Sequence, residues 1–206
     1  MWPDNLGVDV SRESLEKLEQ YQVLLFKWQK AINLVSPKTL QESGVRHFAD
    51  SAQLSKYIGD DVRHIMDWGS GAGFPGAVLA IMRPKIEFTL VESDERKCQF
   101  IRTVSRETST TMRIENCRIE DIADGCDDIP DIITARALKS VKVLLSYAYP
   151  LIEQAPAIRL LLLKGENVEE ELEEALDVYD FSVERWPSVT NPLASVILIS
   201  DIILKV

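Results

Sequence analysis

The sequence predicts an α/β fold: a mostly parallel sheet of seven strands with helices on both faces, preceded by an N-terminal helical extension. Two observations lead to this prediction. From about residue 64 onward, apolar runs with strand character alternate with amphipathic segments, and a glycine cluster directly follows the first of these strands. Alternating strands and helices connect through right-handed crossovers, which produce a parallel sheet buried on both faces.

The size of the chain is sufficient for one core. It has 206 residues, of which 46% are hydrophobic, so one sizeable core can be buried. We expect a single domain over 1–206, with 1–58 as the helical extension and 59–206 as the α/β core. We also expect a monomer.

Targeting and cysteine signals are weak. No stretch approaches the roughly 18 apolar residues of a membrane span, and the first residues lack the layout of a secretion signal. We therefore expect a cytoplasmic protein with no membrane partner.

Cys98, Cys117 and Cys126 have no zinc-type spacing, so we expect reduced thiols and no metal.

Charge is distributed unevenly. The formal net charge is -10, which by itself argues against a nucleic-acid partner because phosphate binding depends on Lys and Arg. However, nine acidic residues and no basic one lie between Gly165 and Glu184, and the rest of the chain is nearly balanced. We interpret this run as a solvated helix face. Composition therefore neither supports nor excludes RNA.

Two helices are predicted before the sheet. Helical periodicity covers 11–34, with Ser11 as a weak cap. Pro37 is expected to end this helix, because a proline forces the preceding residue away from helical angles. A second helix is predicted over about 40–58, ending at Gly59.

The predicted core alternates strands and helices. The strand candidates are 64–68, 86–91, 112–117, 131–134, 158–163, 181–185 and 195–199. The helix candidates are 76–83, 95–107, 141–153 and 168–178. Each helix lies between two strands, as in a doubly wound sheet.

The glycine cluster marks the predicted ligand site, because ligands of doubly wound sheets bind beyond the carboxyl ends of the strands. It reads Asp67-Trp68-Gly69-Ser70-Gly71-Ala72-Gly73-Phe74-Pro75-Gly76. Its last three glycines satisfy the dinucleotide spacing, so a nicotinamide-dependent oxidoreductase is one hypothesis. Asp67 and the additional Gly69 instead resemble the first motif of S-adenosylmethionine-dependent methyltransferases. Glu92 suits both hypotheses, since an acid after the second strand can accept ribose hydroxyls.

Six segments occur in the order and approximate spacing of one family. They are Val45-Arg46-His47-Phe48-Ala49-Asp50-Ser51, Gly69 to Gly76, Leu90-Val91-Glu92-Ser93, Arg118-Ile119-Glu120-Asp121, Thr134-Ala135-Arg136-Ala137 and Leu163-Lys164-Gly165. In these segments the chain resembles the ribosomal RNA small subunit methyltransferase G family, formerly glucose-inhibited division protein B. The resemblance implies a Rossmann-like class I methyltransferase fold, S-adenosyl-L-methionine as cofactor, and methylation of a guanine N7 in 16S ribosomal RNA of the small subunit, with no DNA partner.

The resemblance also implies roles for individual residues. The expected cofactor-binding residues are Asp67, Gly69, Gly71, Gly73, Phe74, Glu92, Ile119, Glu120 and Arg136. Arg136 and Lys164 are expected at the catalytic site, and Arg46, His47, Lys139 and Lys164 at the RNA. An Arg fork can reach a carboxylate, a phosphate or a base edge, although a buried structural ion pair is the alternative for Arg136.

The proposed chemistry needs no general base, because guanine N7 has a lone pair and no proton. Orientation of the reacting atoms can then supply most of the catalysis. The chain departs from the family near its last strand, where Ala194 to Ser200 include no basic residue. This departure motivates a third hypothesis, a catalytically silent assembly factor. The acidic run makes that edge a poor RNA surface, so we expect RNA near the glycine-loop face.

Overall fold

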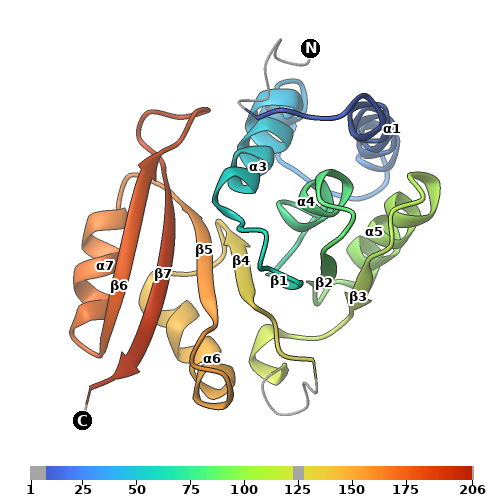
Figure 1. Ribbon diagram of the computed structural model, residues 1–206. Helices are drawn as coiled ribbons and strands as arrows, with labels where there is room; N and C mark the ends of the chain where they lie inside the picture. Colours follow the sequence, from blue (N-terminus) through green and yellow to red (C-terminus); the bar gives the residue numbers. More distant parts are fainter. Residues whose placement is uncertain (1–7, 123–127, 206) are drawn as a thin grey trace.

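The computed structural model describes residues 8–122 and 128–205, and a seven-stranded sheet lies at its centre (Figure 1). The strands are β1 (His64–Trp68), β2 (Glu87–Val91), β3 (Arg113–Glu115), β4 (Ile132–Arg136), β5 (Arg159–Lys164), β6 (Tyr179–Pro187) and β7 (Ser195–Leu204). The helices are α1 (Arg12–Trp28), α2 (Pro37–Leu40), η1 (Gly44–Ala49), α3 (Asp50–Ala52), η2 (Gln53–Tyr57), α4 (Gly76–Met82), α5 (Glu95–Glu107), η3 (Ile119–Asp121), α6 (Val141–Gln154) and α7 (Val168–Leu176). The predicted α/β class is confirmed.

The strand order is β3-β2-β1-β4-β5-β7-β6. The strands β1 to β5 pair in parallel, whereas β7 is antiparallel to both β5 and β6. The order reverses between β1 and β4, so a ligand crevice is expected beyond their carboxyl ends. The antiparallel β7 between β5 and β6 differs from the dinucleotide-binding order, in which strand 6 follows strand 5 directly.

Helices cover both faces of the sheet (Figure 1). Ile65 of β1 lies in a core shared with α1, α4 and α5, while Met66 and Trp68 lie in a second core shared with α6 and α7. Successive strand residues point to opposite faces, so a fully buried run such as β1 supplies both cores. Leu18 and Leu25 of α1 are fully buried in the first core.

The predicted N-terminal helices are wrong in detail. The helix α1 ends at Trp28 because Gln29 turns the chain: its Oε1 accepts hydrogen bonds from the backbone N–H groups of Leu34 and Val35, each at 3.0 Å. Pro37 begins α2 rather than ending α1, with the Ser36 side chain as cap. A proline at the first position after a serine cap is a favourable helix start. The predicted Ser11 cap is confirmed.

The predicted helix over 40–58 is also divided. The short α2 is followed by a π-helical turn (η1), α3 and a 3-10 helix (η2). The wider turn of η1 buries three consecutive residues, His47, Phe48 and Ala49, against the core. Because burial overrides regular helical geometry there, sequence periodicity does not predict these breaks.

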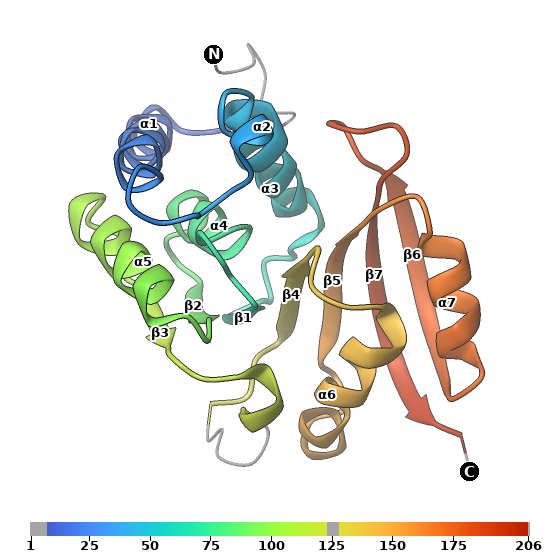
Figure 2. The ribbon, with the colours of Figure 1, turned by 180° about the vertical axis from the view of Figure 1, so that it is seen from behind.

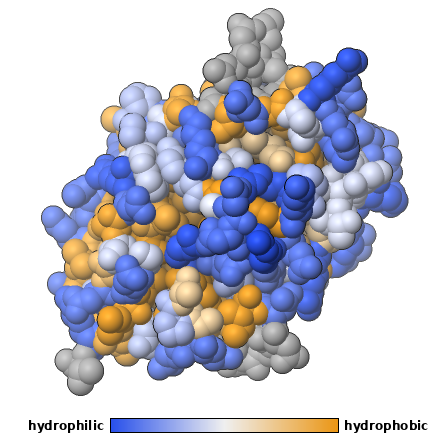
Figure 3. Space-filling view, in the orientation of Figure 1, coloured by the Kyte–Doolittle hydropathy of each residue, from blue (hydrophilic) through white to orange (hydrophobic). Residues whose placement is uncertain are grey.

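Both C-terminal strands are longer than predicted, and β3 is shorter. The pairing of β6 with β7 runs from Tyr179↔Leu204 to Pro187↔Ser195. Figure 3 shows hydrophobic residues gathered over the β6–β7 side of the surface. Most side chains of β6 are exposed, so burial does not define the ends of this strand. Backbone hydrogen bonds rather than a hydrophobic pattern therefore determine where this hairpin ends.

Two remaining sequence predictions concern cysteines and membrane spans. Cys98 is buried and Cys117 half-buried, and neither forms a disulfide; Cys126 lies outside the described residues. No helix within 8–122 or 128–205 has the length and apolar character needed to cross a membrane.

Candidate active site

The glycine loop begins at Asp67, which anchors it from below. This carboxylate is fully buried; Oδ1 accepts a hydrogen bond from the hydroxyl of Thr134 at 2.8 Å, and Oδ2 accepts one from the N–H of Gly76 at 3.1 Å. A Cβ atom at Gly76 would lie 2.7 Å from that of Asp67, so glycine is required for this approach. Burial raises the pKa of Asp67 to about 6, against the opposing effect of its hydrogen bonds.

Three glycines in the loop have positive φ angles: 62° at Gly69, 59° at Gly71 and 89° at Gly73. A Cβ at Gly69 would lie 2.6 Å from Leu138, and one at Gly73 would lie 2.6 Å from the hydroxyl of Tyr21. A Cβ at Gly71 would meet only the carbonyl oxygen of Gly69, at 3.9 Å. Gly71 is therefore the position at which bare backbone faces open space.

An aromatic cluster supports the loop from the N-terminal segment. The ring of Tyr21 stacks on that of Phe74 with centroids 5.4 Å apart, and Phe48 meets Phe74 edge-on at 5.1 Å. The ring of His47 also stacks on Phe74, at 5.1 Å. The N-terminal helices are thus part of the wall of the site.

Glu92 joins the end of β2 to the glycine loop. Its Oε2 accepts a hydrogen bond from the N–H of Gly71, and its Oε1 accepts one from the N–H of Asp94, both at 2.8 Å. The side chain is nearly buried. A carboxylate oxygen has two lone pairs, so each oxygen can accept a further bond from a ligand.

Ile119 and Glu120 lie in η3, after β3. Ile119 is buried in the core that contains α6. Glu120 is exposed and accepts a hydrogen bond from the hydroxyl of Tyr147 at 3.1 Å. Its own backbone N–H, and to a smaller degree Tyr147, lower the pKa of Glu120.

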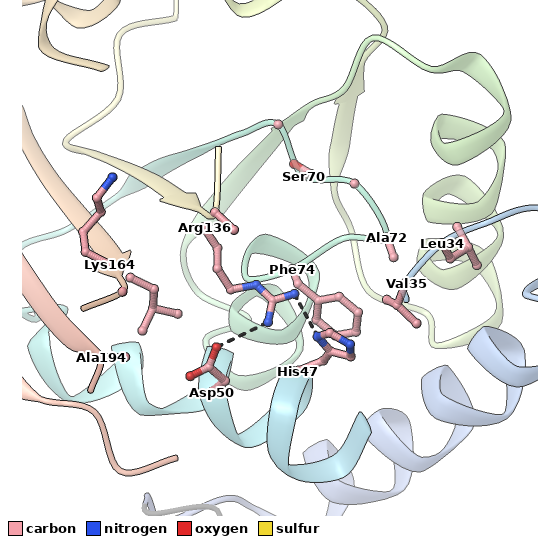
Figure 4. A pocket seen from close by; sticks show the side chains of 15 residues that line it. Leu34, Val35, His47, Asp50, Ser70, Ala72, Phe74, Arg136, Lys164 and Ala194 are labelled. Atoms are coloured by element: carbon pink, nitrogen blue, oxygen red, sulfur yellow. Dashed lines mark hydrogen bonds and ion pairs between the residues drawn. The ribbon is translucent and has the colours of Figure 1, made fainter. Parts of the chain in front are cut away.

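A cavity of about 390 Å³ opens beside the glycine loop (Figure 4). It is lined by Leu34, Val35, His47, Asp50, Gly69, Ser70, Gly71, Ala72, Phe74, Arg136, Ala137, Leu163, Lys164, Gly165 and Ala194. The cavity joins the loop to the ends of β4 and β5 and to the N-terminal segment. Six of the residues predicted from sequence line it: Gly69, Gly71, Phe74, His47, Arg136 and Lys164.

Other predicted site residues lie outside this lining. They are Asp67, Gly73, Glu92, Ile119, Glu120, Arg46 and Lys139. Asp67 accepts a hydrogen bond from Gly76 in the loop, Gly73 lies against Tyr21, and Glu92 accepts a hydrogen bond from Gly71. Arg46 and Lys139 are exposed, and Arg46 pairs with Glu42 at 3.6 Å. Their roles as cofactor or RNA contacts stay predictions.

Arg136, at the end of β4, is the cation aimed into the cavity. Its Nη1 donates a hydrogen bond to the carbonyl oxygen of Arg46 at 3.0 Å and lies 3.3 Å from Oδ2 of Asp50. Its Nη2 donates a hydrogen bond to Nδ1 of His47 at 3.0 Å (Figure 4). The guanidinium lies 5.1 Å from the centre of the Phe74 ring. Arg136 is therefore both an ion-pair partner and a wall of the cavity.

His47 is neutral in this arrangement. Because Nδ1 accepts from Arg136, Nε2 carries the proton and donates it to the hydroxyl of Thr39 at 2.9 Å. Burial, and then the charges of Arg136 and Arg46, lower the pKa of His47 to about 4. The predicted RNA contact at His47 is thus an uncharged ring.

Lys164 lies on the other side of the cavity. Its Nζ donates a hydrogen bond to the carbonyl oxygen of Lys139 at 2.6 Å and pairs with Glu171 at 2.5 Å. Only 8% of the side chain is exposed, and in Figure 4 the ammonium points away from His47 and Phe74. These contacts hold the segment after β4 in place.

Sequence reasoning missed several lining residues. Asp50 belongs to the motif segment around His47 but was not chosen as a site residue, although its place in that segment, close to Arg46 and His47, was a usable signal. Leu34, Val35 and Ala194 carry no local signal, because only the tertiary fold brings them to the cavity.

Comparison with known families decides the assignment. A family model described as rRNA small subunit methyltransferase G matches residues 14–194. The chain belongs to this family. Members named ribosomal RNA small subunit methyltransferase G include one from Paramagnetospirillum magneticum, 45% identical over 89% of this chain and 86% of that protein. Another, from Rhodospirillum rubrum, is 40% identical over 98% of each chain.

Solved structures agree on the fold of this family member. An S-adenosylmethionine-dependent O-methyltransferase from Thermotoga maritima matches with a TM-score of 0.59 and 16% identity, covering 87% of this chain and 71% of that one. Mitomycin 7-O-methyltransferase matches with a TM-score of 0.59 and 14% identity, covering 93% and 69%. The fold is therefore that of the Rossmann-like methyltransferases, as predicted.

Proposed function

We propose that this family member transfers the methyl group of S-adenosylmethionine to N7 of a guanine in 16S ribosomal RNA of the small subunit. The observation that carries the proposal is the cavity beside Gly71, which joins a bare backbone loop to the guanidinium of Arg136. Family membership and the names of the relatives, which are rRNA methyltransferases, support the substrate class.

The residues present fit the cofactor. Gly71 leaves open space where any other residue would place a Cβ, and its positive φ favours glycine. Glu92 holds this backbone and keeps lone pairs for the ribose hydroxyls. Ile119 and Glu120, beyond β3, are the residues proposed to flank the adenine.

When bound, S-adenosylmethionine supplies a methyl group on a positively charged sulfur. The described residues around the cavity are suited to orient an acceptor rather than to remove a proton from it. Both ring nitrogens of His47 are hydrogen-bonded, Asp50 is paired with Arg136, and Lys164 is paired with Glu171. Guanine N7 has no proton to lose, whereas an amino or hydroxyl acceptor does, so this lining favours N7.

Positioning is then the main catalytic contribution. Arg136 can donate to an acceptor atom on the base edge, and the Phe74–His47 wall gives a flat apolar surface for a base. Correct orientation of two reactants contributes roughly 7 to 11 kcal/mol to lowering a barrier.

We also propose that 1–206 form one domain, because α1 is buried in the core of the sheet.

The proposal is tested by incubating the protein with methyl-labelled S-adenosylmethionine and small ribosomal subunits that lack the modification. We expect label in 16S RNA, mapped by mass spectrometry to one guanine, and release of the label on N7-specific depurination. Label on another atom would contradict the N7 assignment, and label in protein alone would contradict the RNA substrate.

The two other hypotheses have separate readouts. A nicotinamide-linked oxidoreductase predicts tight dinucleotide binding and no S-adenosylmethionine binding; the family match and the antiparallel β7 disfavour it. A silent assembly factor, suggested by the absence of a basic residue in Ala194 to Ser200, predicts cofactor binding without turnover on any ribosomal particle. Calorimetric titration with both nucleotides, followed by the transfer assay, separates all three.

A further inference from the structure

Asp50 joins three segments at the wall of the cavity. Its Oδ2 is 3.3 Å from Nη1 of Arg136, at the end of β4. Its Oδ1 accepts a hydrogen bond from the hydroxyl of Thr190, in the loop between β6 and β7, at 2.6 Å. The same oxygen accepts one from the side-chain amide of Gln53 at 3.1 Å. One carboxylate thus links β4, the N-terminal helices and the C-terminal hairpin.

The charge of Arg136 requires such a partner. The side chains of Arg136 and Asp50 are only 17% and 18% exposed, and a guanidinium withdrawn from water needs a compensating charge. His47 accepts a hydrogen bond but is neutral. Asp67 is fully buried beneath the loop, where its carboxylate is held by Thr134 and Gly76. Within the described residues, Asp50 is the acid that forms an ion pair with Arg136.

The same contacts set the direction of the guanidinium. Arginine has five N–H donors. The carbonyl of Arg46, the carboxylate of Asp50 and Nδ1 of His47 each accept one of them. Nε–H and one N–H on Nη2 have no acceptor among the described residues, and Arg136 lines the cavity. Two donors therefore remain for a ligand.

The loop between β6 and β7 is also hydrogen-bonded to Gln53, whose side chain contacts Asp50. Oε1 of Gln53 accepts a hydrogen bond from the N–H of Val189 at 2.9 Å, and Nε2 of Gln53 donates one to the hydroxyl of Ser188 at 3.1 Å. The loop lies beside α3 in both ribbon views (Figures 1 and 2). It ends at Ala194, which lines the cavity. Thr190 and Asp50 therefore form a continuous series of contacts from this loop to Arg136.

We propose that Asp50 is a positioning residue that orients the guanidinium of Arg136 toward the cavity. We also propose that Thr190 links this orientation to the position of the loop 188–194. The proposal rests on the methyl transfer proposed above, in which the remaining donors of Arg136 contact the acceptor or the cofactor. It assigns Asp50 a task that acts through another side chain, so its test needs a readout at Arg136 itself.

His47 supplies that readout, since the chain has only two histidines, His47 and His64. The charged groups facing His47 are Arg136, Arg46 and Asp50. In Asp50→Asn, loss of the negative charge alone lowers the pKa of His47 or leaves it unchanged, whereas departure of Arg136 raises it. The two outcomes thus have different signs.

The experiment follows the His47 imidazole by nitrogen-15 NMR from pH 8 down through its titration. We expect His47 to titrate at a higher pH in Asp50→Asn than in the wild type, because the charge of Arg136 no longer opposes its protonation. Asp61→Asn is the matched control, because Asp61 forms a surface pair with Arg159 at 3.2 Å. A His47 pKa that is unchanged or lower in Asp50→Asn overturns the proposal, because Arg136 then stays in place without Asp50.

Turnover on small ribosomal subunits gives the second readout. We expect Asp50→Asn to lower turnover by tenfold or more, and Thr190→Val, which removes only a loop hydroxyl, to lower it by at least threefold. Should Asp50→Asn fail to fold, Thr190→Val remains decisive for the coupling: turnover equal to that of the wild type overturns it. If the wild type transfers no methyl group to any particle, the proposed function fails, yet the His47 titration still decides whether Asp50 holds Arg136.

Discussion

The hydroxyl of Tyr21, in α1, donates a hydrogen bond to the carbonyl oxygen of Ala72, in the middle of the glycine loop. Tyr21 is fully buried, and burial raises its pKa well above the ordinary value. The phenol is therefore a neutral donor at neutral pH. Through this contact the N-terminal extension, 51 residues away in sequence, fixes the loop proposed to hold the cofactor.

Tyr21→Phe should weaken both the fold and the site. The change leaves the buried Ala72 carbonyl without its donor, which costs about 1 to 3 kcal/mol in the free energy of unfolding. We expect a several-fold loss of S-adenosylmethionine affinity as the loop relaxes. Urea denaturation and calorimetry measure the two effects. Tyr57→Phe is the control, because Tyr57 stacks on Trp186 and its hydroxyl has no hydrogen-bond partner in the described chain. Equal losses in both variants would contradict the role of the Ala72 contact.

Asp67 should contribute more to the free energy of unfolding as the pH falls, which is the reverse of the usual effect of a carboxylate. Its pKa is about 6 in the folded chain and has an ordinary value of 3.8, so the folded state binds this proton more tightly than the unfolded state. Its contribution to the free energy of unfolding is therefore greatest below pH 3.8 and declines as pH rises to about 6. Above that pH, the ionised group costs about 3 kcal/mol relative to the protonated one.

Asp67→Asn isolates this effect from the other carboxylates. An amide can still accept from Gly76 and donate to Thr134. We expect the stability of the variant, relative to wild type, to decrease between pH 7.5 and pH 5, because only the wild type gains a proton there. Urea denaturation at several pH values measures this difference. A difference independent of pH would show that Asp67 has an ordinary pKa.

The core of the fold was predictable because it is encoded locally. The strand β1 was located to the residue, because Ile65, Met66 and Trp68 directly precede the glycine cluster, which marks the end of the strand. The break after α1 was not predictable, because Gln29 folds back onto Leu34 and Val35 through side-chain hydrogen bonds. Likewise, the ends of β6 and β7 depend on their mutual pairing and not on a hydrophobic pattern.

The site was predictable to the extent that its residues lie in motifs. The glycine loop, Arg136 and His47, each taken from a sequence motif, meet at one cavity. Their partners were not predictable. Asp50 is 86 residues from Arg136 in sequence, and Glu171 lies within an acidic run that we interpreted as a solvated face. No spacing rule shows which single acid of such a run turns inward.

Gly71→Ala should reduce cofactor binding with a modest loss of stability. The added methyl group would meet only the oxygen of Gly69, at 3.9 Å, so the fold loses about 1 to 2 kcal/mol from the positive φ alone. We expect at least a tenfold weaker S-adenosylmethionine affinity by calorimetry, because the methyl group projects into the open space. Gly69 is unsuited to this test, since a Cβ there would lie 2.6 Å from Leu138.

Gly165→Ala is the control for Gly71→Ala. Gly165 also lines the cavity, but a Cβ there would meet nothing within 4 Å, and its φ is not positive. We expect unchanged stability and unchanged cofactor affinity, because Gly165 follows β5 and is not among the residues proposed to bind S-adenosylmethionine. If both variants bind S-adenosylmethionine as tightly as the wild type, the cofactor does not contact Gly71.

Glu171 should be the one acid of α7 whose loss is costly. Its carboxylate pairs with the buried Lys164 and accepts a hydrogen bond from the N–H of Val141 at 2.9 Å, at the start of α6. Removing one partner leaves a poorly solvated ammonium, so we expect Glu171→Ala to lower the free energy of unfolding by about 3 kcal/mol. Glu174→Ala, on the exposed face of α7, should change it by less than about 0.5 kcal/mol. A double-mutant cycle completes the test, with denaturation of Glu171→Ala, of Lys164→Met and of the variant that carries both changes. The double variant should be more stable than the sum of the two single losses implies, because the unpaired charge is gone. Additive losses would place Lys164 outside this pair and return its ammonium to the cavity as a candidate RNA contact.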